Sequence, residues 1–120
     1  MSQKPYDGVA AWPWVRKEKQ QTGAAANVDL WAAPGSGISV VLHRIVVTAN
    51  TAGTTIQVTE GADAAGTRII DVYAPANGGI VLEFPFEAPY QLAANTALNL
   101  TTSGNNVKVT VWGWEKLVTL

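Results

Sequence analysis

The chain has 120 residues, no cysteine and a formal net charge of −1. This length predicts one domain with a core that needs no disulfide or metal. Disulfides, thiolate metal sites and cysteine nucleophiles are excluded, and the small net charge gives no field to attract nucleic acid or anionic lipid. Charged residues make up only 14% of the chain. Such a surface fits a protein packed against others, and equally an ordinary β domain with a threonine-rich surface.

Residues 1–22 differ in composition from the rest of the chain. They hold two prolines, two tryptophans and half of the eight lysines and arginines, and no period of 2 or 3.6 runs through them. We therefore predict an extended N-terminal arm over residues 1–22 and one β-sandwich domain over residues 23–120. The start of the chain lacks a signal-peptide core, and no apolar run approaches the roughly 20 residues that cross a bilayer. We expect synthesis in a cytoplasm and no membrane partner.

Eight segments after residue 22 have the composition of β-strands and are separated by turn residues. They are residues 25–31, 37–49, 54–60, 67–73, 80–84, 90–92, 97–102 and 107–115. Strands at a spacing of roughly 8–12 residues, with no helical segment, favour a sandwich or barrel. Long connections favour a jelly roll over an immunoglobulin sandwich. The predicted fold class is an all-β, eight-stranded antiparallel jelly-roll β-sandwich.

Alternating apolar positions in these segments predict the core. Its members are Val28, Leu30, Ile38, Val40, Leu42, Ile45, Val47, Ile56, Val58, Ile70, Val72, Ile80, Leu82, Phe84, Leu98, Leu100, Val107, Val109 and Val111.

The apolar residues of the segment 37–49 change parity along the strand. Ile38, Val40 and Leu42 share one parity, whereas Ile45 and Val47 share the other. Either both faces are covered, or a bulge near His43 reverses the parity. A central strand with apolar residues of both parities, in a chain with few surface charges, predicts a homo-oligomer. We expect a homotrimer.

No catalytic constellation stands out. His43 is the only histidine, which rules out a cupin-type metal site of several histidines, and no serine lies in a Gly-x-Ser-x-Gly elbow. Glu60 and Asp63 flank a turn and could offer oxygen ligands to calcium, but their spacing matches no EF-hand, and a solvated turn is favoured. We therefore predict no catalytic, cofactor-binding or metal-binding residues and no enzyme activity.

Trp112 and Trp114 lie in the last strand segment. Since alternate residues share a face, the valines at 107, 109 and 111 face the core and both tryptophans face outwards with Lys108 and Thr110. Large aromatic residues on an outer face mark contact sites. Two interpretations stay open: a partner protein binds both indoles, or the arm or another strand of the same subunit covers them.

The arm carries a second aromatic cluster, Trp12 and Trp14, followed by Arg16, Lys17 and Lys19. Aromatic residues interleaved with basic ones can bind single-stranded nucleic acid. The cluster is short and the rest of the chain is neutral, so we favour an arm that inserts two indoles into pockets of a partner protein. The basic residues would then contact acidic groups of the partner.

Five segments carry a resemblance to a known class of proteins. They are Leu-His-Arg-Ile-Val-Val-Thr-Ala (42–49), Gly-Thr-Thr-Ile-Gln-Val (53–58), Asn-Gly-Gly-Ile-Val-Leu-Glu-Phe (77–84), Leu-Asn-Leu-Thr-Thr-Ser (98–103) and Val-Trp-Gly-Trp-Glu (111–115). These segments resemble small virion proteins of tailed bacteriophages, and the most similar type is the capsid decoration, or cement, protein with a jelly-roll body. The resemblance implies a non-enzymatic homotrimer on the virion surface. It would bind the major capsid (coat) protein, with N-terminal arms reaching over neighbouring coat subunits.

A carbohydrate-binding module or receptor-binding tip is the alternative. Such domains are often jelly rolls that present aromatic platforms beside Asn, Asp or Gln. Trp112 and Trp114 could form the platform, and Asn105 and Asn106 lie in the turn before them. A measurement of whether the chain binds glycans or capsids distinguishes the two classes.

Overall fold

The computed structural model describes residues 15–50, 52–61, 66–85, 87–104 and 107–118. These residues form nine strands: β1 (Val15–Gln21), β2 (Ala25–Trp31), β3 (Ile38–Ala49), β4 (Thr54–Glu60), β5 (Thr67–Ala74), β6 (Gly79–Glu83), β7 (Tyr90–Gln91), β8 (Leu98–Thr102) and β9 (Val107–Leu117). Within them, no helix is long and apolar enough to cross a membrane.

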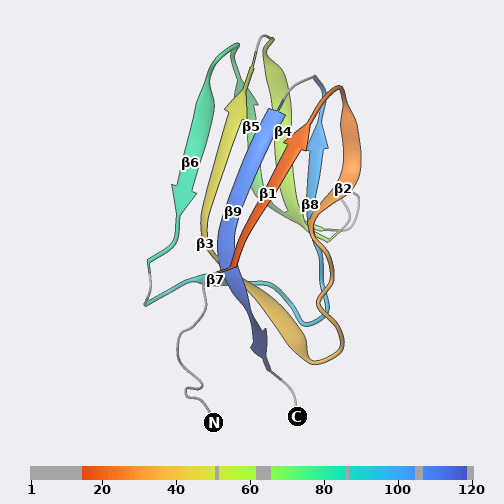
Figure 1. Cartoon of the computed structure of the whole chain (residues 1–120), viewed down its shortest axis with the longest axis vertical. Helices are drawn as coiled ribbons and strands as arrows, with labels where there is room; N and C mark the ends of the chain where they lie inside the picture. The colour runs from red at the N-terminus through yellow and green to blue at the C-terminus, as the bar shows by residue number, and fades with distance from the viewer. Residues whose placement is uncertain (1–14, 51, 62–65, 86, 105–106, 119–120) are drawn as a thin grey trace.

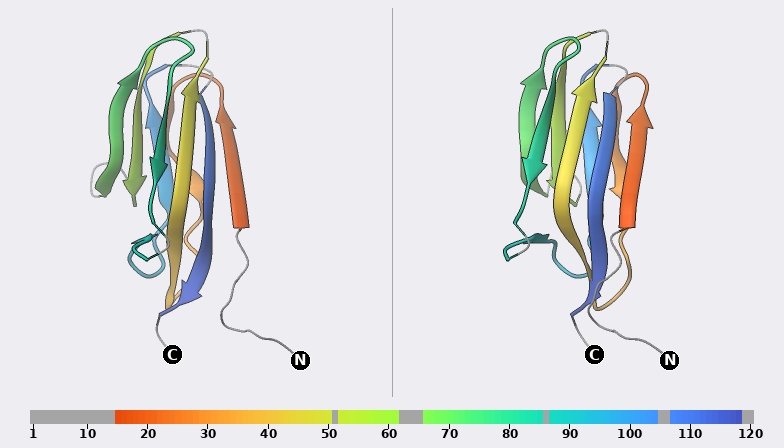
Figure 2. Two further views of the ribbon diagram at one scale, coloured as in Figure 1. Left: turned by 90° about the vertical axis from the view of Figure 1, so that its left-hand side faces the viewer. Right: turned by 60° about the vertical axis from the view of Figure 1, so that its left-hand side comes forward.

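The strands form two antiparallel sheets that pack face to face as a sandwich (Figures 1 and 2). The front sheet has the order β1-β9-β3-β6, and the short β7 pairs with β3 beside β6. The back sheet has the order β2-β8-β4-β5. Each strand of a sheet can bury one face against the other sheet, which explains the alternating apolar pattern in the sequence.

The strand pairing follows a jelly roll. β1 pairs with β9, β2 with β8, β3 with β6 and β4 with β5, as in one long antiparallel hairpin. Rolling this hairpin adds the pairs β3 with β9 and β4 with β8. The predicted all-β jelly-roll sandwich is confirmed. Its eight long strands include β1, which was not predicted, whereas the predicted strand at 90–92 is the two-residue β7.

The arm prediction is wrong for residues 15–21. They form β1, which pairs with β9 from Val15 opposite Gly113 to Gln21 opposite Val107. The strand was missed because it has no apolar alternation: its backbone pairs with β9, while its charged side chains suit a sheet edge. Within the described part of the chain, the sandwich therefore begins at Val15. The other predicted arm residues, including Trp12 and Trp14, lie outside the described residues.

Of the two alternatives for β3, the structure shows the bulge. Leu42 lies opposite Gly113 and Arg44 opposite Trp112, so His43 is the extra residue on β3. The strands approach so closely here that a Cβ at Gly113 would overlap the backbone oxygen of Val41. Glycine is therefore required opposite the bulge.

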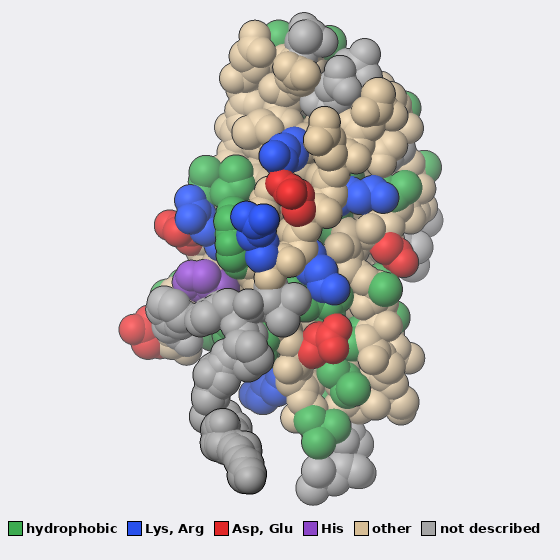
Figure 3. All heavy atoms as spheres, viewed as in Figure 1, with side chains coloured by type: hydrophobic (Ala, Val, Ile, Leu, Met, Phe, Trp, Pro, Cys, Tyr) green, Lys and Arg blue, Asp and Glu red, His purple; other side chains and the backbone are tan. Residues whose placement is uncertain are grey.

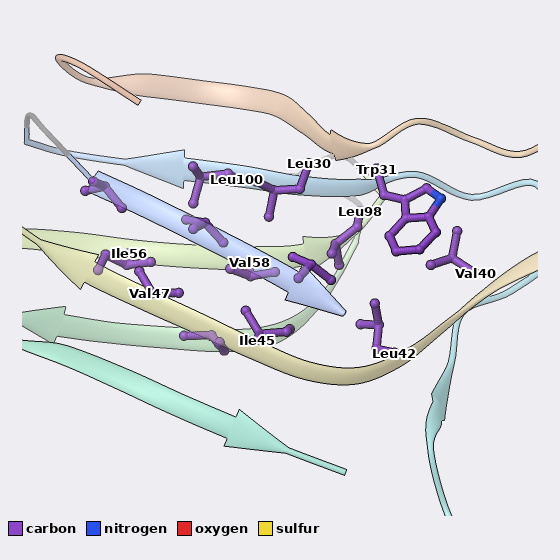
Figure 4. Packing of buried hydrophobic residues seen from close by; sticks show 14 of the residues in the cluster. Leu30, Trp31, Val40, Leu42, Ile45, Val47, Ile56, Val58, Leu98 and Leu100 are labelled. Atoms are coloured by element: carbon purple, nitrogen blue, oxygen red, sulfur yellow. The ribbon is translucent and has the colours of Figure 1, made fainter. Parts of the chain in front are cut away.

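Because of the bulge, apolar residues of both parities in β3 reach the core. Figure 4 shows side chains of β3 meeting those of β2, β4 and β8 between the sheets. The buried cluster is Leu30, Trp31, Val40, Leu42, Ile45, Val47, Ala49, Ile56, Val58, Ile70, Ala74, Leu92, Leu98, Leu100, Val107, Val109 and Val111.

The core prediction was accurate except at strand ends and in the edge strands β2, β5 and β6. The predicted residues Val28, Val72, Ile80, Leu82 and Phe84 are only partly buried and pack against the cluster, and Ile38 is partly buried. The members of the buried cluster that were not predicted are Trp31, Ala49, Ala74 and Leu92. All four lie at or just after the end of a strand, where alternation does not determine the direction of a side chain.

We expect Ile45→Ala to destabilise the fold by about 2–5 kcal/mol, because Ile45 is fully buried and its truncation leaves a cavity. The matched control is Thr48→Ala, on the exposed face of the same strand, with an expected change below about 1 kcal/mol. Equilibrium denaturation measures both. Equal effects from the two variants would contradict the assigned parity of β3 after the bulge.

Candidate functional site

The outward side of the front sheet carries the two tryptophans of β9. Cross-strand partners lie on the same face of a sheet. Arg16 of β1, Trp112 of β9, Arg44 of β3 and Glu83 of β6 therefore form one row across the sheet. The next row towards the C-terminus of β9 holds Trp114 opposite Val41 of β3 and Gln91 of β7, and we call these two rows the tryptophan face. Figure 3 looks onto this side of the molecule, where hydrophobic side chains lie among basic and acidic ones.

Arg44 lies over the indole of Trp112, with its guanidinium carbon 5.1 Å from the ring centroid. A cation over an indole at an exposed site contributes roughly 0.5–1 kcal/mol. The Nε of Arg44 is 3.5 Å from Oε2 of Glu83, which is an ion pair by distance but lacks hydrogen-bond geometry. Both side chains are well exposed, so this pair contributes little to stability and remains available to a partner.

Val41 shows that the Trp114 end of this face is closely packed. Its exposed fraction is 1%, yet it does not belong to the core cluster, since it points to the outer side opposite Trp114. Ser39, two residues earlier on the same side, is equally buried, and its hydroxyl has no hydrogen-bond partner among the described residues. Trp112 and Trp114 are half-buried. This end of the face therefore combines two half-buried indoles and a buried valine with the polar side chains of Ser39 and Gln91.

The face becomes polar towards the start of β9. Lys108 Nζ lies 3.0 Å from Oε2 of Glu18 on β1. The hydrogen bond and the charge of Lys108 lower the pKa of Glu18. Val46 of β3 and the well-exposed Val81 of β6 continue the apolar surface on the same outer face, towards the β6 edge of the sheet.

The structure separates the predicted basic residues. Arg16 joins the tryptophan face, but Lys17 and Lys19 have the opposite parity on β1. Lys17 Nζ lies 5.3 Å from the ring centroid of Trp31, whose Nε1 donates a hydrogen bond of 2.9 Å to Glu115. Lys17 therefore contacts its own subunit and links β1 to β2. Partner contacts by the predicted residues stay predictions, and Trp12 and Trp14 lie outside the described residues.

Sequence reasoning missed Arg44 and Val41 as members of the face. Their parity relative to Trp112 and Trp114 follows only from the position of the bulge and the register of β3 on β9. The available signal was Arg44 itself. It is an arginine within the apolar segment that forms β3, and a charged side chain there must face outwards.

Neither His43 nor Glu60 belongs to a metal cluster, since no group of three or more potential ligands lies together among the described residues. His43 is the half-buried bulge residue. Glu60 accepts hydrogen bonds from the Tyr90 hydroxyl at 2.9 Å and from the Ala93 backbone N–H at 2.6 Å. Its carboxylate thus fastens the chain around β7 to the end of β4. Asp63, the other carboxylate of that turn, lies outside the described residues.

The Tyr90 hydroxyl is held neutral by this contact. Partial burial, followed by the hydrogen bond and the negative charge of Glu60, raises the pKa of Tyr90 to about 12. The phenol also lies beside Phe84, with ring centroids 5.5 Å apart.

No protein-family model matches the chain, and no curated protein matches its sequence. Among solved structures, the chain is similar to one from the cryo-EM structure of the virus-like particle of extra small virus of the giant freshwater prawn Macrobrachium rosenbergii. The match has 12% sequence identity and a TM-score of 0.40, and it covers 95% of this chain and 86% of that one.

We expect the protein to lose stability as the pH rises from about 10 to about 12 because Tyr90 ionises later in the folded state than in the unfolded state. Its contribution is complete below the ordinary tyrosine pKa and is lost as the pH rises through the folded value. Denaturation at several pH values should show a smaller loss in Tyr90→Phe over this window. Tyr73→Phe, at an exposed tyrosine, should behave as wild type. An unchanged pH profile in Tyr90→Phe would contradict the link to Glu60.

Proposed function

We propose that the chain is a non-enzymatic virion structural protein that binds the outside of a phage capsid as a decoration, or cement, protein and stabilises the coat lattice. The observation that carries the proposal is the tryptophan face. Trp112 and Trp114 stand on the outer side of a sheet whose inner side already buries the core. Half-exposed indoles in a sandwich of low charge are typical of protein contact sites.

The charges around the indoles indicate the partner's chemistry. Arg16 and Arg44 flank Trp112 on the two neighbouring strands, and Glu83 partly balances them. A complementary surface has an apolar pocket for the indole and carboxylates at its rim for the arginines. A coat-protein surface with acidic side chains around a groove has this character.

The N-terminal segment is the second proposed contact. Val15 lies opposite Gly113, which stands between the two tryptophans of β9, so the described part of the chain begins beside the tryptophan face. Trp12 and Trp14 in that segment can therefore bind the same coat subunit or its neighbour. The homotrimer stays a prediction from the sequence.

Carbohydrate binding is the second candidate, favoured by two half-exposed tryptophans on one sheet face. The position of Arg44 over the ring of Trp112 argues against it, because a sugar would need that ring surface. Asn105 and Asn106, the other residues of the carbohydrate hypothesis, lie outside the described residues.

The double variant Trp112→Ala/Trp114→Ala should bind capsids at least about tenfold more weakly, since central indoles carry much of an interface's energy. Co-sedimentation with capsids of the virus whose genome carries the coding sequence measures this. Tyr73→Ala, at an exposed aromatic residue of the back sheet, is the matched control and should bind as wild type. Unchanged capsid binding by the double variant, with glycan-array binding lost, would favour the carbohydrate function instead.

Deletion of residues 1–14 should leave the sandwich folded and weaken capsid binding, because β1 remains paired with β9. Deletion of residues 1–20 should in addition destabilise the fold, since it removes almost all of β1 from the front sheet. Thermal unfolding and the co-sedimentation assay measure the two effects. If the chain without residues 1–14 binds capsids as tightly as the full chain, the N-terminal segment is no anchor.

A further inference from the structure

The four outermost strands of the two sheets differ in how they are protected against pairing with another chain. β1 and β6 are the edges of the front sheet, and β2 and β5 are the edges of the back sheet. An edge strand presents unpaired backbone groups, and proteins usually protect it with charges, bulges or proline. An edge without such protection is a candidate for strand pairing.

Three of these edges are protected. β1 has the sequence Val-Arg-Lys-Glu-Lys-Gln-Gln, with four consecutive charges. β2 contains two register shifts, and Asn27 within it has a φ of 51°. β5 is bulged opposite Val58 and Thr59, and it carries the ion pair of Arg68 with Asp71 at 2.7 Å.

The edge strand β6, Gly79–Glu83, contains neither a bulge nor a proline, and its one charged residue, Glu83, is the last of the strand. Its sequence is Gly-Ile-Val-Leu-Glu, and it pairs with β3 over five consecutive residues without a register shift. Val81 at its centre points outwards with an exposed fraction of 54%. Ile80 and Leu82, on the inner side, are only half-buried. This edge is straight, apolar and incompletely covered.

Hydrogen bonds at both ends of β6 determine which backbone groups point towards β3. Ala49 N donates to Gly78 O at 2.8 Å, and Phe84 N donates to His43 O at 2.8 Å. In an antiparallel pair, bonded and non-bonded residue pairs alternate along the ladder. The even-numbered residues of β6 therefore direct their N–H and C=O groups to β3.

It follows that Gly79, Val81 and Glu83 direct their N–H and C=O groups away from β3, to the open side of the sheet. These three residues are evenly spaced, with Val81 at the centre. Among the described residues, no strand pairs with β6 on this side. The open side thus presents three donors and three acceptors in the geometry of a β-ladder.

We propose that β6 pairs with β6 of a second copy of this chain, antiparallel and about a two-fold axis at Val81. Val81 then lies opposite Val81 of the second copy, and Gly79 lies opposite Glu83 in both directions. Each of these three pairs exchanges two hydrogen bonds, which makes six in all. The two front sheets become one continuous sheet.

The side chains fit this register. Val81 packs against Val81 on the outer side, and Ile80 packs against Leu82 of the other copy on the inner side, where both are half-buried in the single chain. The two Glu83 carboxylates lie four residue positions apart along the ladder, roughly 14 Å, so no like charges meet. The segment is complementary to itself, which is why a second copy fits better than an unrelated strand.

The dimer has a functional consequence. A two-fold axis perpendicular to the joined sheet leaves both tryptophan faces on the same side. Two copies can then bind a lattice simultaneously, which raises the apparent affinity without new contacts.

Disulfide cross-linking tests the register directly, because the chain has no cysteine of its own. In the dimer, the Cα atoms at position 81 are about 5.5 Å apart, within the roughly 4.4–6.8 Å that a disulfide spans. We expect full-length Val81→Cys to form a covalent dimer under mild oxidation. Glu83→Cys, on the same strand and face, should stay monomeric in a denaturing gel. Equal cross-linking of both variants, or none by Val81→Cys, would overturn the proposal.

Sedimentation velocity over a concentration series tests the contact without a covalent bond. Wild type should dimerise reversibly, and Val81→Pro should raise the dimer Kd at least about tenfold because it removes the outward N–H from each copy. That N–H makes no bond to β3, so the fold should persist, as checked by circular dichroism.

Val81→Lys places two positive charges opposite each other and should also weaken dimerisation. Tyr73→Lys, at the back-sheet edge, is the control. A monomeric wild type, or a dimer or trimer unaffected by both Val81 variants, would contradict the proposal.

Discussion

The extra residue His43 in β3 is the constraint on which the front sheet depends. Without it, the parity set by Val40 and Leu42 would continue, so that Ile45 and Val47 would face solvent and Arg44 would enter the core. An unpaired guanidinium in an apolar core is costly, and two large apolar side chains would lose their burial. The glycine opposite the bulge makes this solution possible, since a side chain there would overlap the β3 backbone.

The same bulge organises the outer side of the sheet. It brings Arg44 into the row of Trp112, and it marks the point where the neighbour of β3 changes from β7 to β6. On one side of it lie Trp114 and the buried Val41, and on the other side lie Val46, Val81 and the unprotected edge of β6. The proposed partner face and the proposed dimer edge are therefore adjacent parts of one surface, set by one local irregularity.

Much of the fold could be predicted because alternating apolar residues and turn residues identify strands locally. The segments 25–31 and 54–60 coincide with β2 and β4, and the parity change in β3 made a bulge one of two alternatives, which the register of β3 on β9 decides. β1 was missed because a polar edge strand has no such alternation. The row of Arg16, Trp112 and Arg44, and the stacking of Lys17 on Trp31, depend on pairing between distant strands, which a single sequence does not determine.

The most direct measurement is an electron cryo-microscopy reconstruction of capsids decorated with the chain. If the tryptophan face is the partner-binding surface, the front sheet will lie against the coat protein, with Trp112 and Trp114 buried and Arg16 and Arg44 close to acidic side chains. A reconstruction in which the front sheet faces solvent and the back sheet, with the exposed Tyr73, contacts the capsid would contradict the account.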